Sequence, residues 1–247
     1  NGPFADENLR LAVSYALDYD SFRTVFGSAY ASNPNRGFVP PVTVGYKETE
    51  ALGQDLDKAA QYMADAGYAE KNADGFYVNA SGEVCTFTLT CNAGKEAHVG
   101  YAELVKTQLE QFGIQVVLET LDGDSYNAKT SNKFSENNIT MEAAIYGYTA
   151  AGMGMKNGLA TIYVDGTHPV QGGCQVFDEG FQAILAEMSA AKTLDEYSAA
   201  ASEMQDWYAA HMPFIALYWD SQLLAHSAVY ENFTVDAVFG LNNANTW

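Results

Sequence analysis

The stretch from Cys85 to Leu121 constrains the fold more than any other part of this sequence. It opens with CTFTLTC, where apolar residues alternate with threonines, and this period of two predicts a half-buried strand. The next run, EAHVGYAELVKTQLEQFG, repeats apolar residues at the spacing of one helix face: Tyr101, Leu104, Val105, Leu109 and Phe112. IQVVLETL then predicts a well-covered second strand. Strand, helix and strand with short joints form a βαβ unit, so we expect an α/β layered core.

Helix signals occur on both sides of this unit. Asp6, Asp55 and Thr193 each precede an amphipathic run and are expected to be N-cap residues. Gly27 and Gly113 each follow one, where a helix end often needs a glycine. A further amphipathic run, DEGFQAILAEMSAA, predicts another helix before the one that Thr193 caps.

Further strands are expected outside the βαβ unit. The turn signal Ser81–Gly82 lies between FYV and the opening strand, which predicts a hairpin that feeds this strand. MEAAIYGY predicts a third strand, PFIALYW another, and QLLAHSAVY is a further candidate. The proline-containing segment 29–45 predicts a long ordered loop. Together these elements predict a mixed central sheet flanked by helices.

The charge of the chain excludes some classes of partner. Its formal net charge is −19, from 31 acidic against 12 basic residues. Nucleic-acid binding requires clustered lysine and arginine, and so does docking on anionic lipid, so we expect neither. No apolar run approaches the roughly 18 residues that a membrane helix needs. An acidic, solubilising surface is the simplest interpretation of this charge.

The three cysteines leave the redox state open. Cys85 and Cys91 lie on one predicted strand, roughly 20 Å apart at about 3.3 Å per residue. A disulfide needs Cα atoms within about 7 Å, so these two cannot bond each other. Cys174 pairs with one of them, or all three remain thiols; the sequence leaves both alternatives open.

Signatures of catalysis and of metal binding are missing from the sequence. There is no G-x-S-x-G motif, and His98, His168, His211 and His226 are spread along the chain without a pair at i and i+4. Asp122 and Asp124 do not continue into a calcium loop, so we interpret them as helix-start residues. We therefore expect a binding module rather than an enzyme, with no cofactor and no metal. An α/β hydrolytic enzyme domain is the alternative from another class.

Four blocks of the sequence occur in a recognisable order. They are PFADENLRLAVSYALDYDSF, with Arg10, Ala12, Ala16 and Asp18; LDKAAQYMADAGY, with Lys58, Ala59, Ala66, Gly67 and Tyr68; LVKTQLEQFGIQVVLETLDGDSY, with Gln108, Leu109, Gly113, Ile114 and Tyr126; and EYSAAASEMQDWYAAHMPFIALYW. In this order they resemble the C-terminal lobe of the extracytoplasmic solute-binding proteins of family 5. These proteins are the receptors of peptide and nickel ABC importers, of the oligopeptide- and dipeptide-binding type.

The resemblance implies an architecture and a set of partners. It implies an α/β lobe of the periplasmic-binding-protein type II fold, with residues 1–228 as the C-terminal ligand-binding lobe and residues 229–247 returning towards a missing N-terminal lobe. A small solute, most simply a peptide, would be captured between the lobes by hinge closure and passed to the membrane permease. The resemblance also implies an extracytoplasmic location, with a lipid anchor in the absent N-terminal part. A receptor that feeds a sensor is a further alternative.

The ligand-facing residues are expected in two loops. The glycine-rich run Tyr148–Gly158 follows the third strand, and its small residues let backbone donors approach a ligand, while tyrosines offer a face and a hydroxyl. From this region we expect ligand contacts by Tyr146, Tyr148, Thr149, Met153, Lys156 and Asn157. The resemblance places the loop Asn33–Pro41 at the border of the cleft, which adds Arg36 and Phe38.

The sequence departs from the family at one point. After the third strand, many peptide-binding members carry an aromatic residue and then an aspartate that pairs with the amino terminus of the peptide. The corresponding run here, IYGYTAAGMGMKNG, has tyrosines and no acid. Oligosaccharides and other small solutes therefore stand beside peptides as expected ligands.

Overall fold

The computed structural model describes residues 2–41, 43–130, 141–147 and 178–221, together with residues 223, 225, 227, 229 and 234. The helices in these ranges are η1 (Pro3–Ala5), α1 (Glu7–Ala16), α2 (Tyr19–Phe26), α3 (Leu56–Asp65), α4 (Glu96–Phe112), α5 (Gly123–Thr130), α6 (Glu179–Ala190) and α7 (Leu194–His211). The strands are β1 (Glu70–Lys71), β2 (Tyr77–Val78), β3 (Thr86–Asn92), β4 (Gln115–Leu121) and β5 (Ala143–Ala144).

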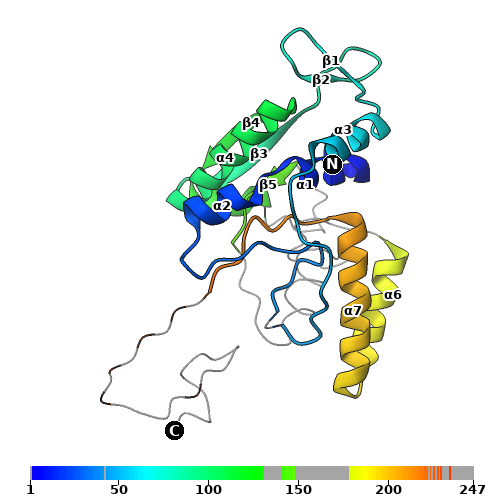
Figure 1. Ribbon diagram of the computed structural model, residues 1–247, viewed down its shortest axis with the longest axis vertical. Helices are drawn as coiled ribbons and strands as arrows, with labels where there is room; N and C mark the ends of the chain where they lie inside the picture. The colour runs from blue at the N-terminus through cyan, green and yellow to red at the C-terminus, as the bar shows by residue number, and fades with distance from the viewer. Residues whose placement is uncertain are drawn as a thin grey trace.

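A parallel sheet with the order β4-β3-β5 is the centre of the fold (Figure 1). β3 pairs in parallel with β4 from Thr86↔Gln115 to Asn92↔Leu121, and with β5 at Leu89↔Ala143 and Thr90↔Ala144. The expected βαβ unit is therefore confirmed, and so is the α/β class. Among the described residues this sheet contains only parallel pairs; the antiparallel pair β1–β2 forms a separate small sheet.

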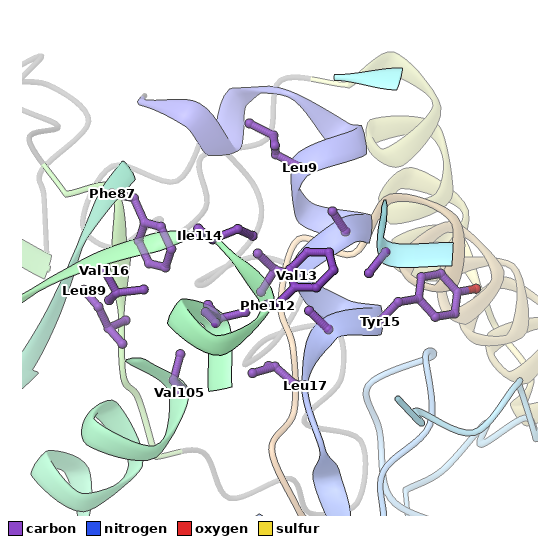
Figure 2. Packing of buried hydrophobic residues seen from close by; sticks show 14 of the residues in the cluster. Leu9, Val13, Tyr15, Leu17, Phe87, Leu89, Val105, Phe112, Ile114 and Val116 are labelled. Atoms are coloured by element: carbon purple, nitrogen blue, oxygen red, sulfur yellow. The ribbon is translucent and has the colours of Figure 1, made fainter. Parts of the chain in front are cut away.

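The main hydrophobic core lies between this sheet and the helices α1, α3 and α4. Figure 2 shows side chains from α1, α4 and both long strands turned towards one another. Those least exposed include Phe22, Ala59, Met63, Cys91, Leu109, Ile114 and Val116. Cys85 and Cys91 are both buried and free, and Cys174 lies outside the described residues.

Helices α6 and α7 lie side by side and pack on a second, separate core (Figure 1). Its buried residues are Val39, Phe181, Leu185, Met188, Tyr197, Ala200, Ala201, Met204 and Tyr208. Thr193 begins α7 as the N-cap residue that its sequence predicts, and it forms a capping box: its hydroxyl accepts from the Glu196 amide, and the Glu196 carboxylate accepts from the Thr193 amide. Tyr208 belongs to this core and Trp207 packs against it.

Gln205 fastens the loop that precedes α3 to α7. Its side chain is fully buried, donates to the Gly45 carbonyl at 2.7 Å and accepts from the Lys47 amide at 2.8 Å. Gly45 and Lys47 are therefore held against α7, at the end of the segment 29–45 that the sequence predicts to be a long ordered loop.

Several predicted strands are shorter than expected or absent. The hairpin turns at Asp74–Gly75 between β1 and β2, and the predicted turn at Ser81–Gly82 closes only one bridge, Val78↔Val84. The third strand has two residues, β5. PFIALYW forms no strand; only Trp219 pairs, with Ser32. The prediction that the second strand is well covered was wrong, because β4 is an edge strand among the described residues and Val117 is 52% exposed.

The predicted boundary at residue 228 stays a prediction. QLLAHSAVY is described only at every second position, and those residues are exposed. No helix among the described residues combines the length and the apolar character needed to cross a bilayer.

Candidate functional site

The carboxyl ends of the parallel strands define the candidate site. β3 ends at Asn92, β4 at Leu121 and β5 at Ala144, and because the three strands run in parallel, these ends lie at one edge of the sheet. In open α/β sheets, ligands bind outside the carboxyl ends of the strands. This edge is therefore where the fold favours a ligand.

Asn92 shapes the turn that leaves β3. Its side-chain oxygen accepts from the Gly94 amide at 2.8 Å, and its carbonyl accepts from the Lys95 amide at 3.1 Å. The turn leads into α4, whose N-cap residue Lys95 makes no side-chain cap hydrogen bond. The N-terminal end of a helix dipole carries partial positive charge, so this turn brings a positive end to the edge of the sheet.

Asp122 organises the exit of β4 in the same way. Its carboxylate accepts from the amides of Asp124 and Ser125 at 3.0 and 3.1 Å and from the Ser125 hydroxyl at 2.7 Å. The Ser125 hydroxyl, as the main cause, lowers the pKa of Asp122. The prediction that Asp122 and Asp124 are helix-start residues is thereby confirmed, and both carboxylates stand where α5 begins.

Tyr146 lies at the exit of β5, in the site region that the sequence predicts. Its hydroxyl donates to the Thr130 carbonyl at the end of α5, at 2.8 Å. In the opposite direction the Tyr126 hydroxyl, on α5, donates to the Ile145 carbonyl at 2.5 Å. The centres of the two tyrosine rings are 5.7 Å apart.

His98 adds a buried imidazole to this edge. It lies in the first turn of α4, is 7% exposed, and its Nδ1 has no hydrogen-bond partner among the residues that the structure describes. Burial lowers the pKa of His98, and the charge of Lys95 adds to this, while the Ile145 backbone acts in the opposite sense. His98 Nε2 would be 3.5 Å from a Cβ built on Gly147. The spacing of the histidines was weighed only for a metal site and did not predict this position of His98. The signal for it is the place of His98 soon after β3, a strand that ends at the carboxyl edge.

Arg36 packs in the interior, against α1. It is 3% exposed, its guanidinium lies over the Tyr15 ring, and its Nε is 3.4 Å from a carboxylate oxygen of Glu50. Its Nη2 donates to the Ser14 hydroxyl at 3.3 Å. The predicted ligand contact by Arg36 stays a prediction, and the contacts seen here hold the loop against α1.

Phe38 packs towards α7 instead. It has a positive φ of 71° and stacks on Tyr208, with ring centres 5.8 Å apart, while its ring centre lies 5.2 Å from that of Phe214. Arg36 and Phe38 thus contact different helices, and Tyr146 belongs to the exit of β5. The other predicted contacts, Tyr148, Thr149, Met153, Lys156 and Asn157, lie outside the described residues.

No cluster of potential metal ligands occurs within the described ranges. Of the four histidines, His98 and His211 are described, and His168 and His226 are not. His211 pairs with the carboxylate of Glu7 and lies against Trp207, with ring centres 4.5 Å apart. The two described histidines therefore have different surroundings, one at the edge of the sheet and one between α7 and α1.

Larger proteins of known structure contain the fold of this chain as one part. The chain matches the oligopeptide-binding protein AppA from Bacillus subtilis, solved in complex with a nonapeptide, with a TM-score of 0.74 and 19% identity, over 88% of this chain and 42% of that chain. It also matches the mannohexaose-bound periplasmic oligopeptide-binding protein of an ABC transporter from Thermotoga maritima, with a TM-score of 0.76 and 14% identity, over 89% of this chain and 42% of that chain. The expected fold is confirmed.

The family follows from the sequence comparison. The model of the bacterial extracellular solute-binding proteins, family 5 (middle part), matches residues 1–167, and the chain belongs to this family. The oligopeptide-binding protein AppA of Bacillus subtilis is 27% identical over 127 residues, which are 49% of this chain and 23% of that protein. The aligned residues cover only about a quarter of the length of these curated relatives. The family is one of solute-binding proteins and not of enzymes.

Proposed function

We propose that the protein to which this chain belongs is the solute-binding receptor of an ABC importer, and that this chain supplies one of its ligand-binding lobes. The observation that carries the proposal is the family match over residues 1–167. The ligand that we propose is a peptide, because the sequence relatives include oligopeptide-binding proteins from two bacteria.

The geometry of the sheet supports a binding role for this chain. The carboxyl edge brings together the N-terminal end of α4, the buried imidazole of His98 and the hydrogen-bonded exit of β5 at Tyr146. Polar groups of this kind orient a ligand, while a second lobe would cover it and exclude water. We propose that the ligand is enclosed between the two lobes by hinge closure. A single lobe then makes only part of the contacts, so the isolated chain should bind weakly or not at all.

One observation favours a second class of ligand. The run 145–158, IYGYTAAGMGMKNG, contains tyrosines and no acid that would pair with the amino group of a peptide. Tyrosine faces and hydroxyls suit sugars, and a protein of the same fold from Thermotoga maritima was solved with mannohexaose. An oligosaccharide or another small neutral solute is therefore the alternative ligand.

The proposal includes a location and partners for the whole protein. An importer receptor works outside the cytoplasm and delivers its ligand to a membrane permease. We propose that the lipid anchor lies in an N-terminal part of the protein and that the second lobe is encoded in the same polypeptide. The gene sequence upstream of Asn1 checks both, because it should encode a lobe preceded by an export signal with a lipobox cysteine.

Native mass spectrometry on the full-length receptor, purified gently from its own host, tests the ligand class. We expect a co-purifying mass that fragments as a peptide. A co-purifying mass that fragments as a sugar would support the oligosaccharide instead of the peptide as the ligand. The proposed function would be contradicted if the receptor co-purified with no ligand and, in titration calorimetry, bound neither a random peptide mixture nor oligosaccharides. Micromolar or tighter binding to the isolated chain would contradict the two-lobe enclosure.

A further inference from the structure

Within the described part of the chain, few hydrogen bonds of the sheet itself hold the segment that leaves β5. β5 has two residues, and it pairs with β3 only at Leu89↔Ala143 and Thr90↔Ala144. One more bond extends the pairing, from the Ile145 amide to the Thr90 carbonyl at 3.0 Å. A strand this short forms few backbone hydrogen bonds with its neighbour, so other contacts must fix the position of residues 145–147.

Two tyrosines supply those contacts, one from each side. Tyr126 on α5 donates to the Ile145 carbonyl at 2.5 Å, and Tyr146 donates to the Thr130 carbonyl at 2.8 Å. Their rings also lie against each other, at 5.7 Å between centres. The strand exit and the end of α5 are thus joined by two hydrogen bonds that run in opposite directions. We call this pair the tyrosine clamp.

The position of the clamp links it to the candidate site. Tyr126 is 4% exposed and lies on the helix that follows β4, while Ile145 and Tyr146 follow β5. The Thr130 hydroxyl donates to the Tyr126 carbonyl at 2.7 Å, which ties the last turn of α5 to the clamp residue itself. The clamp therefore connects the helix that follows β4 to the segment that follows β5. Both lie at the edge of the sheet where a ligand is expected.

We propose that Tyr126 is a positioning residue of the ligand site: through the Ile145 carbonyl it fixes the Ile145–Gly147 backbone that faces the ligand. The proposal rests on the proposed function for its ligand. Its physical basis is pre-organisation, because a backbone segment held in place before binding does not have to be ordered by the ligand. Tyr126 itself makes no contact with the ligand in this role.

The test uses the full-length receptor with the variants Tyr126→Phe and Tyr19→Phe. The control is matched, because Tyr19 is 1% exposed and donates its hydroxyl to a backbone carbonyl, that of Ser14, at 2.7 Å. Each variant removes one buried hydroxyl and keeps the ring. We expect Tyr126→Phe to weaken binding of the native ligand about five- to tenfold, the effect of losing one hydrogen bond. We expect Tyr19→Phe to stay within about twofold of the wild type, although it loses stability to a similar extent.

A second readout needs no ligand. In hydrogen exchange on the ligand-free receptor, Tyr126→Phe should speed exchange of the amides of residues 145–147, and Tyr19→Phe should leave them unchanged. Equal effects of the two variants, on affinity or on this exchange, would overturn the positioning role. A wild-type receptor that binds neither peptide nor oligosaccharide would instead overturn the proposed function, and the exchange data would still decide whether the clamp fixes the segment.

Discussion

The guanidinium carbon of Arg36 lies 3.9 Å from the centre of the Tyr15 ring. A cation over an aromatic face is stabilising, and more so where water is excluded. Here the arginine is 3% exposed and joins the loop 33–41 to α1. Glu50 and the Ser14 hydroxyl provide its polar partners. The family resemblance places this loop at the border of the cleft. The buried side chain of Arg36 therefore fixes the loop to α1.

Replacing Arg36 by lysine should lower the free energy of unfolding by about 1–3 kcal/mol, because an ammonium group cannot reproduce the flat stacking and the separate hydrogen bond. Urea unfolding of the chain measures this. Arg23→Lys is the control: Arg23 is exposed at a surface ion pair with Asp20, so its replacement should cost less than about 0.5 kcal/mol. Unchanged stability of Arg36→Lys, combined with loss of ligand affinity in the full-length receptor, would favour a direct ligand contact instead.

Gly113 ends α4 with φ +116°, and a Cβ added there would lie 2.7 Å from the Gly75 carbonyl oxygen. Gly113→Ala should therefore destabilise the chain by at least about 1–2 kcal/mol, since left-handed backbone and a steric clash act together. Gly53 offers a matched control, because a Cβ there meets nothing within 4 Å. Thermal unfolding should show a drop in Tm for Gly113→Ala and little change for Gly53→Ala; equal melting of the two would refute this account of the helix end.

The core and the open face of the βαβ unit should respond differently to truncation. Leu109 on α4 is fully buried, so Leu109→Ala is expected to cost about 2–5 kcal/mol of stability. Val117 on β4 is 52% exposed, so Val117→Ala is expected to cost less than about 1 kcal/mol. Chemical unfolding curves of both variants compare them directly. A large loss at Val117 would mean that another part of the chain covers β4.

Acid should weaken the fold through His98. Burial holds its pKa below the usual 6.5, so at pH values between the folded and the unfolded pKa the unfolded chain binds more protons. Stability should therefore fall as the pH drops below about 6.5, and Lys95, which disfavours a second positive charge, acts in the same direction. The free energy of unfolding, measured between pH 7.5 and 5.5, should depend less on pH in His98→Gln. An unchanged pH dependence in that variant would show that other groups cause it.

Local signals made much of the fold predictable. Asp6, Asp55 and Thr193 each accept a backbone hydrogen bond at the start of the helix that was expected there. Helix capping depends only on residues that are close in sequence, and the same holds for the left-handed glycine at position 113. The period of two before α4 predicted β3 for the same reason.

Features that depend on distant partners were not predictable in this way. PFIALYW is apolar enough for a strand, but only Trp219 finds a partner, Ser32. Arg36 is charged, and the sequence does not show that Tyr15 and Glu50 lie around it. The tyrosine clamp joins residues 19 positions apart, and no local pattern marks Tyr126 as the partner of Ile145.

In the proposed function, the carboxyl edge of the β4-β3-β5 sheet faces the ligand of a peptide receptor. Hydrogen–deuterium exchange of the full-length receptor, with and without a saturating peptide mixture, tests it most directly. We expect slower exchange on binding in the segments 92–98 and 145–147, with little change in α7. Unchanged exchange in both segments, together with slower exchange elsewhere in this chain, would contradict this placement of the ligand.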